Sequence, residues 1–427
     1  MTAVDETIER VTARRVWDSR GRPTIEAEVH LPNGIVGRAM APAGASTGSN
    51  EAVDLRDGGR SHGGQDVAQA IGGVAREISP ALAGLAVTDQ TRLDQVLIQL
   101  DGTANKSRLG GNALIAVSMA ALHAAAGLAG KPLWRHLLGG APPIVPLPEI
   151  QIFGGGAHAG RRVDVQDFMV MAIGASSFGQ ALDWTADVYR AAGVRLANRG
   201  RLRGVADEGG YWPVFDTNEE ALECLLCAIE DAGRTPGDDV AISLDIAASE
   251  FHVSGRYRLG LEARELDRDE LCELLCGWIG RYPIVSIEDP VSEHDTAGMQ
   301  KFTAAVGPRV QVVGDDYLVT DATRVEQAAR EQACNALLVK PNQAGTITET
   351  KAAFDAARRA GWGTIVSARS GETEDVTIAH LAIGWGAGQL KVGSFSRSER
   401  MAKWNEVLRI EEALGDAAVF AGRDVLP

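Results

Sequence analysis

The sequence has no uninterrupted apolar run of about 18 residues, so we expect no membrane-spanning helix. It also lacks a basic excess: 57 Asp and Glu residues outnumber 42 Lys and Arg residues, which gives a net charge of −15. Because nucleic-acid binders usually show a basic balance or stripe, no nucleic-acid partner is expected. The first residues, MTAVDETIERV, contain neither the apolar stretch nor the small-residue cleavage site of a secretion signal. These absences predict a cytoplasmic protein.

Cysteine is scarce and odd in number, with five residues in the chain. Cys224 and Cys227, like Cys272 and Cys276, lie three or four positions apart in apolar, helix-like stretches. This spacing favours buried free thiols over a disulfide or a metal site. A reducing compartment fits this interpretation.

The rest of the composition is that of a globular protein, with 45% apolar and 23% charged residues in 427. Such a length predicts two or three domains, or a small domain beside a large barrel. The 49 glycines indicate many tight turns and loops in which the backbone lines a binding site.

Two patterns divide the chain. Residues 10–40 alternate apolar and polar side chains around two turn signals, which predicts an antiparallel β-meander. A glycine-rich loop, PAGASTGSNEA, follows, and residues 65–136 have helical periodicity. We therefore predict an N-terminal α+β domain over residues 1–138. The proline-rich segment GGAPPIVPLPE is interpreted as the linker to a second domain over residues 139–427.

The second domain contains short β-branched runs, each ending in a polar residue and followed by a helical stretch. The runs are AISLD, IVSIE, VQVVGD, ALLVK, GTIVS and QLK, and all but the first of the intervals between their ends are 24 to 27 residues. A strand, a helix and two short loops need about that length. Continuous apolar strands are typical of parallel sheets that are buried on both faces. The sequence thus predicts an α/β fold in which a (β/α)₈ barrel follows the α+β domain.

Active sites of such barrels lie at the carboxyl ends of the strands. Three successive runs end in Asp245, Glu288 and Asp315. Converging carboxylates repel one another unless a cation joins them, and an all-oxygen ligand set favours Mg²⁺. The next run ends in Lys340, which alone could be only an ion-pair partner. A cation and burial would both lower its pKa, so we interpret Lys340 as a base that removes a proton α to a carboxylate.

Nearly the whole sequence resembles the enolase family, through motifs that occur in the family's order. They are DSRGRPTIEAEV, GASTGSNEAVDLRDG, LDGTANKSRLGGNALIAVSMA, GGAHA, VDVQDFM, DEGGYWP, SLDIAASEF, SIEDP, VGDDYLVT, KPNQAGTITET, SARSGETED and GSFSRSERMAKWNEVLRIEE. The resemblance implies an enolase-type capping domain and barrel, Mg²⁺ as cofactor and a homodimer or higher homo-oligomer. It further implies an anionic phosphorylated or phosphonylated acid as substrate, of the 2-phosphoglycerate or phosphoenolpyruvate type, processed through a metal-stabilised enediolate.

Site roles follow from the resemblance, position by position. Asp245, Glu288 and Asp315 would hold the first Mg²⁺, and Ser46 of the GASTG loop would help hold a second, substrate-assisted one. Lys340 would be the base, while Glu208 would act as the acid and His158 would close over the site on its own loop. The implied substrate contacts are Gln166 and Lys391 at the carboxylate, and Arg369 and Ser370 at the phosphoryl group, which suits the planar fork of arginine.

The departures from the family gather on one side of the predicted pocket. Asp167 stands where the family has Glu, and Ala368 where it has His; both family side chains surround the leaving hydroxyl. Further differences are Tyr211, Trp212 and Val214 beside Glu208, Gly154 before His158, and Ala43 before the GASTG loop. A changed substrate would explain this pattern, and carboxyphosphonoenolpyruvate synthase of phosphonate biosynthesis is the family variant that fits. Two alternatives stay open: an ordinary enolase that has drifted, and a non-catalytic binding relative.

Overall fold

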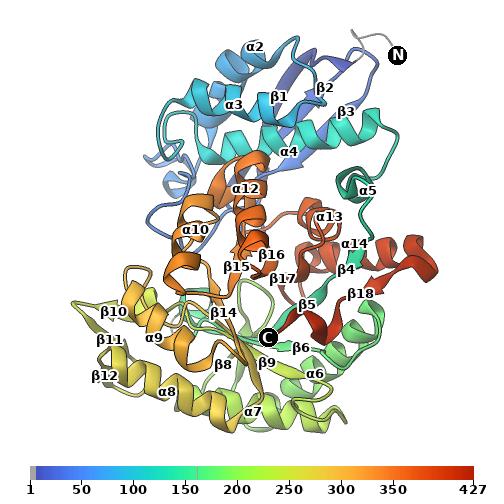
Figure 1. Ribbon diagram of the computed structural model, residues 1–427. Helices are drawn as coiled ribbons and strands as arrows, with labels where there is room; N and C mark the ends of the chain where they lie inside the picture. Colours follow the sequence, from blue (N-terminus) through green and yellow to red (C-terminus); the bar gives the residue numbers. More distant parts are fainter. Residues whose placement is uncertain (1–5, 161) are drawn as a thin grey trace.

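The N-terminal domain is a three-stranded sheet covered by helices in the computed structural model, which describes residues 6–160 and 162–427 (Figure 1). Strands β1 (Arg10–Trp17), β2 (Pro23–His30) and β3 (Val36–Met40) pair antiparallel in that order, as the alternation predicts. Helix α4 (Gly111–Leu128) packs on β2 and β3. Gly37 permits this close approach, because a Cβ there would lie 2.0 Å from the Ala120 carbonyl oxygen.

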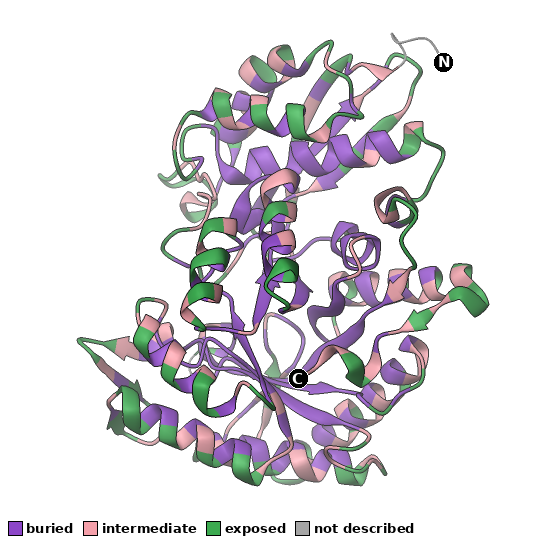
Figure 2. Cartoon of the chain, in the orientation of Figure 1, coloured by how far each residue is buried: buried purple, intermediate pink, exposed green. Residues whose placement is uncertain are grey.

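Helix α4 is apolar and long enough to cross a membrane by length and composition alone. However, 83% of it is buried inside the protein, and Figure 2 shows it as an almost continuously buried element. Burial of this kind is what the central helix of a folded core requires.

The second domain is a closed barrel of eight strands, as predicted. They are β5 (Leu147–Gly154), β6 (Asp167–Met171), β9 (Ala241–Asp245), β13 (Ile284–Glu288), β14 (Gln311–Gly314), β15 (Ala336–Val339), β16 (Gly363–Ser367) and β17 (Gly388–Ser394). Pairing of β17 with β5 closes the ring. The outer helices include α6 (Phe178–Asn198), α7 (Asn218–Asp231), α8 (Arg268–Arg281), α9 (Thr296–Val306), α10 (Ala322–Glu331), α12 (Ile347–Arg359), α13 (Thr377–Gly384) and α14 (Ser398–Leu414) (Figure 1).

One strand differs from the expected parallel arrangement. β6 runs antiparallel to both of its neighbours, β5 and β9, because the described residues that connect it to β5 form only a loop with the four-residue 3-10 helix η4 (Gly156–Ala159), and no crossover α-helix. Its first residue, Asp167, therefore lies at the barrel end where the other strands finish, in register with Asp245. The reversal is what brings Asp167 to the predicted site.

The linker between the two domains is shorter than the proline-rich segment that was predicted to form it. Helix α5 (Leu133–Leu138) ends before it, but β4 (Ile144–Val145) and β5 already begin within it. Composition alone overestimated the length of the linker, because Pro146 borders a strand and Pro148 lies within one rather than in a free loop. The five cysteines are free thiols, as predicted, and Cys224, Cys272 and Cys334 are buried; Cys227 and Cys276, which were also expected to be buried, are only partly so.

A buried carboxylate fixes the capping domain to the barrel. Asp94, on α3 (Gln90–Asp101), accepts hydrogen bonds from the Thr348 backbone NH at 2.8 Å and from the Ser118 hydroxyl at 2.6 Å. The Ser118 hydroxyl in turn accepts one from the Ile347 NH. Free NH groups at the start of α12 thus receive partners from the other domain, which holds the capping loops over the barrel mouth.

Candidate active site

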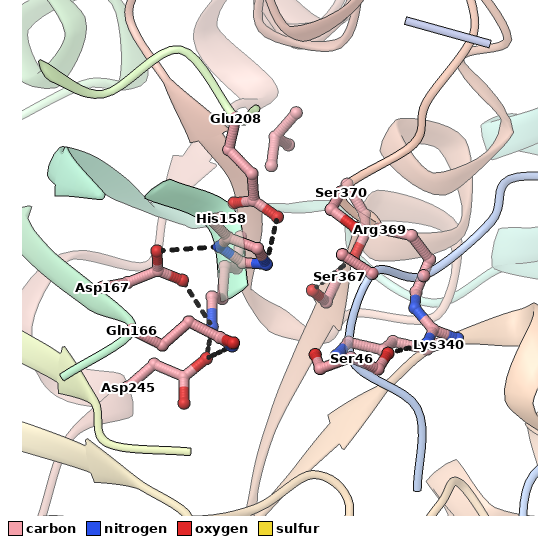
Figure 3. A pocket seen from close by; sticks show the side chains of 15 residues that line it. Ser46, His158, Gln166, Asp167, Glu208, Asp245, Lys340, Ser367, Arg369 and Ser370 are labelled. Carbon is pink, nitrogen blue, oxygen red and sulfur yellow. Dashed lines mark hydrogen bonds and ion pairs between the residues drawn. The ribbon is translucent and has the colours of Figure 1, made fainter. Parts of the chain in front are cut away.

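A cavity at the carboxyl ends of the barrel strands contains most of the predicted site residues (Figure 3). It contains about 320 Å³ of empty space, counted together with its opening to solvent, and lies beneath the loop of the capping domain that carries Ser46. The lining residues are Gly44, Ala45, Ser46, His158, Gln166, Asp167, Glu208, Asp245, Lys340, Ser367, Ala368, Arg369, Ser370, Lys391 and Val392. Of the predicted site residues, Glu288 and Asp315 do not line this cavity but lie directly behind its lysines.

Two of the predicted metal-binding carboxylates share an ammonium group. Asp245 and Glu288 end adjacent parallel strands in register, and both accept hydrogen bonds from Lys391 Nζ, at 3.1 and 2.7 Å. Burial raises the pKa of Glu288 well above its ordinary value, and the neighbouring Asp245 carboxylate raises it further. Glu288 Oε1 is buried and has no hydrogen-bond partner among the described residues. The donor set is all oxygen and incompletely satisfied, so it fits a hard divalent cation.

The third carboxylate, Asp315, follows β14 and belongs to a different pair. Its Oδ2 accepts a hydrogen bond from Lys340 Nζ at 2.5 Å, and its Oδ1 accepts one from Gln343. Asp315 also lies in a compact acidic group with Asp289 and Asp316, whose oxygens could hold a metal ion. Sequence reasoning missed Gln343, Asp289 and Asp316, although each is within three residues of a predicted site residue.

Lys340 follows β15 and is buried, with 8% of its surface exposed. Burial lowers its pKa, but the surrounding carboxylates, Asp315 foremost and Glu288 with it, together outweigh burial, so the pKa is raised rather than lowered as expected. The expectation of a lowered Lys340 pKa assumed that a cation is bound. A cation that engages Asp315 would remove the main cause of the raised value and leave burial to favour the neutral amine.

The side of the cavity that was predicted to bind a phosphoryl group is built by loops from both domains. Arg369 donates to Glu51, to Asn342 Oδ1 and, at 3.0 Å, to the backbone carbonyl of Ser46. Ala43 and Gly371 exchange two backbone hydrogen bonds of 2.8 Å, which fasten the GASTG loop over the cavity.

Arg20 is a further member of this side that sequence reasoning missed. Its guanidinium donates to the Ala43 carbonyl at 2.9 Å and to the Ser370 hydroxyl at 3.4 Å. The DSRGRPT motif containing Arg20 was visible in the sequence, but nothing in it linked residue 20 to residue 370. Arg20 therefore connects the GASTG loop to Ser370.

On the opposite side, His158, Asp167 and Glu208 form one buried group (Figure 3). His158 Nδ1 lies 3.2 Å from Asp167 Oδ1, and its Nε2 lies 3.9 Å from Glu208 Oε1. Gln166 instead donates to Asp245 Oδ2 at 3.0 Å, and its own Oε1 has no partner among the described residues. Burial lowers the pKa of His158, but Asp167 and Glu208 outweigh it and raise that pKa to about 9.

We expect the His158 imidazole to titrate near pH 9 in the folded protein. Because this pKa is raised from an ordinary 6.5, its charge stabilises the fold fully below pH 6.5 and ceases to do so as the pH rises through 9. Asp167→Asn should lower the value toward 6.5. Imidazole chemical shifts in an NMR titration measure both values, and a pKa near 6.5 in the unmodified protein would contradict the assignment.

The departures noted in the sequence do not all face the cavity. Ala368 and Asp167 line it, whereas Tyr211, Trp212 and Val214 do not. Trp212 packs against Gly160 and stacks under the Arg162 guanidinium, 5.0 Å from the ring centre, so it supports the His158 loop. Gly154 has no room for a side chain, because its Cβ would lie 2.5 Å from Ala206 Cβ. The change confined to the cavity is therefore Asp167 with Ala368.

A metal prediction follows from the carboxylates. Asp315→Ala should abolish the stabilisation that Mg²⁺ gives, which is about 2.7 kcal/mol when Mg²⁺ is present at 100 times its dissociation constant. Thermal unfolding with and without Mg²⁺ measures the difference, so that any loss of stability in the metal-free variant cancels. Asp355→Ala, on the surface pair with Lys351, is the control. Unchanged Mg²⁺ affinity by calorimetry would refute the ligand assignment.

Comparison with known families matches both domains. Residues 8–137 match the family model described as the enolase N-terminal domain. Residues 142–427 match the one described as the enolase C-terminal TIM barrel domain. Together the matches span nearly all of the chain.

Proposed function

Since the chain belongs to the enolase family, we propose that it is a Mg²⁺-dependent carboxyphosphonoenolpyruvate synthase of phosphonate biosynthesis. Its acceptor would be an anionic three-carbon acid of the 2-phosphoglycerate or phosphoenolpyruvate type. The observation that carries the proposal is the asymmetry of the cavity. Lysines, carboxylates and Arg369 remain on the metal and phosphoryl sides, while the hydroxyl side has the short Asp167 and the small Ala368.

The chain's own residues would divide the work. Asp245, Glu288 and Asp315 would hold the cation, which when bound supplies positive charge to the substrate carboxylate. Lys340 would take the proton at C2, and Lys391 with Gln166 would orient the carboxylate. Arg369 and Ser370 would hold the phosphoryl oxygens, with Ser46 at the second cation.

The side of the cavity that faces the leaving hydroxyl in the family would then hold a bulky second reactant, which dehydration does not need. Ala368 carries no proton donor, and Asp167 is engaged by His158 and Gln151. The nucleotide-activated phosphonoformate would then approach the three-carbon acid from this side, past Asp167 and Ala368.

Phosphorus NMR of one reaction tests this function. The protein, Mg²⁺ and 2-phosphoglycerate are incubated with and without nucleotide-activated phosphonoformate. The proposal expects a new phosphonate product only in the complete mixture, and little phosphoenolpyruvate without the second reactant. Rapid dehydration with no use of phosphonoformate identifies an ordinary enolase. Mg²⁺ binding without turnover or exchange at C2 identifies a non-catalytic relative.

Two assignments come with this proposal. We propose a cytoplasmic homo-oligomer, since metabolic enolases have this form, and no nucleic-acid or membrane partner. Sedimentation analysis of the purified chain tests the oligomeric state.

A further inference from the structure

An acidic residue to which no role has been assigned lies beneath the active site. Glu149 is on β5, in register with Lys391 on β17, and is 2% exposed inside the barrel. The interior of a (β/α)₈ barrel is ordinarily filled with branched apolar side chains. On the other side of this barrel the interior is indeed apolar, with Val313, Leu338 and Ile365 packed together.

Glu149 is only half satisfied. Its Oε1 accepts a hydrogen bond from the Ser243 hydroxyl, and its Oε2 is buried without a partner among the described residues. A buried carboxylate oxygen without a partner is costly and calls for a specific reason. Burial raises the pKa of Glu149, and the Lys391 ammonium is the charge that most opposes this rise.

The Lys391 ammonium donates its hydrogen bonds to other carboxylates. Its Nζ pairs with Glu288, Asp245 and, at 3.8 Å, Asp167, and none of its ion pairs among the described residues is with Glu149. A divalent cation bound by Asp245 and Glu288 would compete with the ammonium for those oxygens. The displaced ammonium then needs another anion close by, and the free Oε2 of Glu149 lies on the adjacent strand at the same level.

We propose that Glu149 is a positioning residue that receives the Lys391 ammonium when Mg²⁺ takes Asp245 and Glu288. This inference rests on the metal-dependent part of the proposed function but on no particular substrate. Glu149 lowers the cost of cation binding, because Lys391 exchanges one carboxylate partner for another instead of being left unpaired. It also keeps the ammonium anchored from below, with its remaining protons directed toward the carboxylate of a substrate.

Calorimetry with Mg²⁺ alone tests the exchange in the full-length protein. Glu149→Gln keeps the shape and the Ser243 hydrogen bond but removes the charge. We expect its Mg²⁺ dissociation constant to rise about tenfold or more, the scale on which an opposite charge at about 4–6 Å shifts an ionic equilibrium. The matched control is Gln311→Met: Gln311 is also buried in the barrel and also has an unpartnered atom, Nε2, but its bonded neighbour is Ser286. It should change the constant less than threefold.

Each outcome is decisive. A rise of less than threefold in Glu149→Gln, or an equal rise in Gln311→Met, overturns the role of Glu149 and leaves the proposed function standing. An unmodified protein that binds no Mg²⁺ overturns both. If Glu149→Gln does not fold, the crystal structure of the unmodified protein with Mg²⁺ decides. Lys391 Nζ within hydrogen-bond distance of Glu149 supports the proposal, and a Glu149 bonded only to Ser243 and water refutes it.

Discussion

Lys340→Ala should reduce exchange of the C2 proton of a bound phosphoglycerate-type acid with deuterated water by roughly 10²–10⁴-fold. Lys340 follows β15 at the barrel mouth, its side chain is buried, and its Nζ lies in the cavity beside Asp315. Exchange reports proton removal itself, whatever the second reactant. Proton NMR of 2-phosphoglycerate in deuterated water with Mg²⁺ follows it directly.

Two variants separate a base from a binding residue. Lys391→Ala should weaken substrate binding as well as the rate, because its ammonium sits among Asp245, Glu288 and Asp167 where the substrate carboxylate would lie. Lys351→Ala, on the surface of α12, should change neither. Exchange at the unmodified rate in Lys340→Ala would remove Lys340 from the role of base.

The strand-end residues could be predicted from the sequence because each is a local signal. A buried run followed by a polar residue recurs at regular intervals, and barrel geometry alone then brings Asp245, Glu288, Asp315 and Lys340 to one end. The N-terminal meander was equally local. Family resemblance added the loops, and the structure places Ser46, His158 and Arg369 together around the cavity.

Contacts made across the fold could not be predicted in this way. No feature of the sequence near β6 indicates that this strand runs antiparallel. Its antiparallel direction is what places Asp167 beside His158. Arg20 reaches Ser370 across 350 positions of sequence. Glu149 interrupts an apolar strand, and strand alternation could have flagged it as facing inward, but its neighbour Lys391 comes from the opposite end of the chain. Lys340 and Lys391 also pair with different carboxylates, and which carboxylate each one contacts depends on side-chain geometry.

Asp167→Glu combined with Ala368→His should raise dehydration of 2-phosphoglycerate and suppress the proposed phosphonate-forming reaction. Each restored group could supply roughly 10²–10⁴-fold if it acts in proton transfer to the leaving hydroxyl. Both positions line the cavity, and a histidine at 368 would fill space that Ala368 leaves beside Arg369 and Ser367. Formation of phosphoenolpyruvate, followed by its absorbance, measures the gain, while phosphorus NMR measures the loss of the phosphonate product.

The single variants distinguish shape from chemistry. Asp167 is 1% exposed and already bonded to His158, so an added methylene alone shifts the carboxylate, and a misplacement of about 1 Å can cost roughly 10²-fold in rate. Ala368→His alone should exclude the bulkier reactant without restoring full dehydration, because Asp167 still stands one methylene short. Ala368→Leu, similar in bulk but without a proton donor, should suppress the proposed phosphonate-forming reaction and restore no dehydration. Full dehydration by the unmodified protein would show instead that Asp167 and Ala368 are compatible with ordinary enolase chemistry, and the changed pocket would then have no bearing on the choice of substrate.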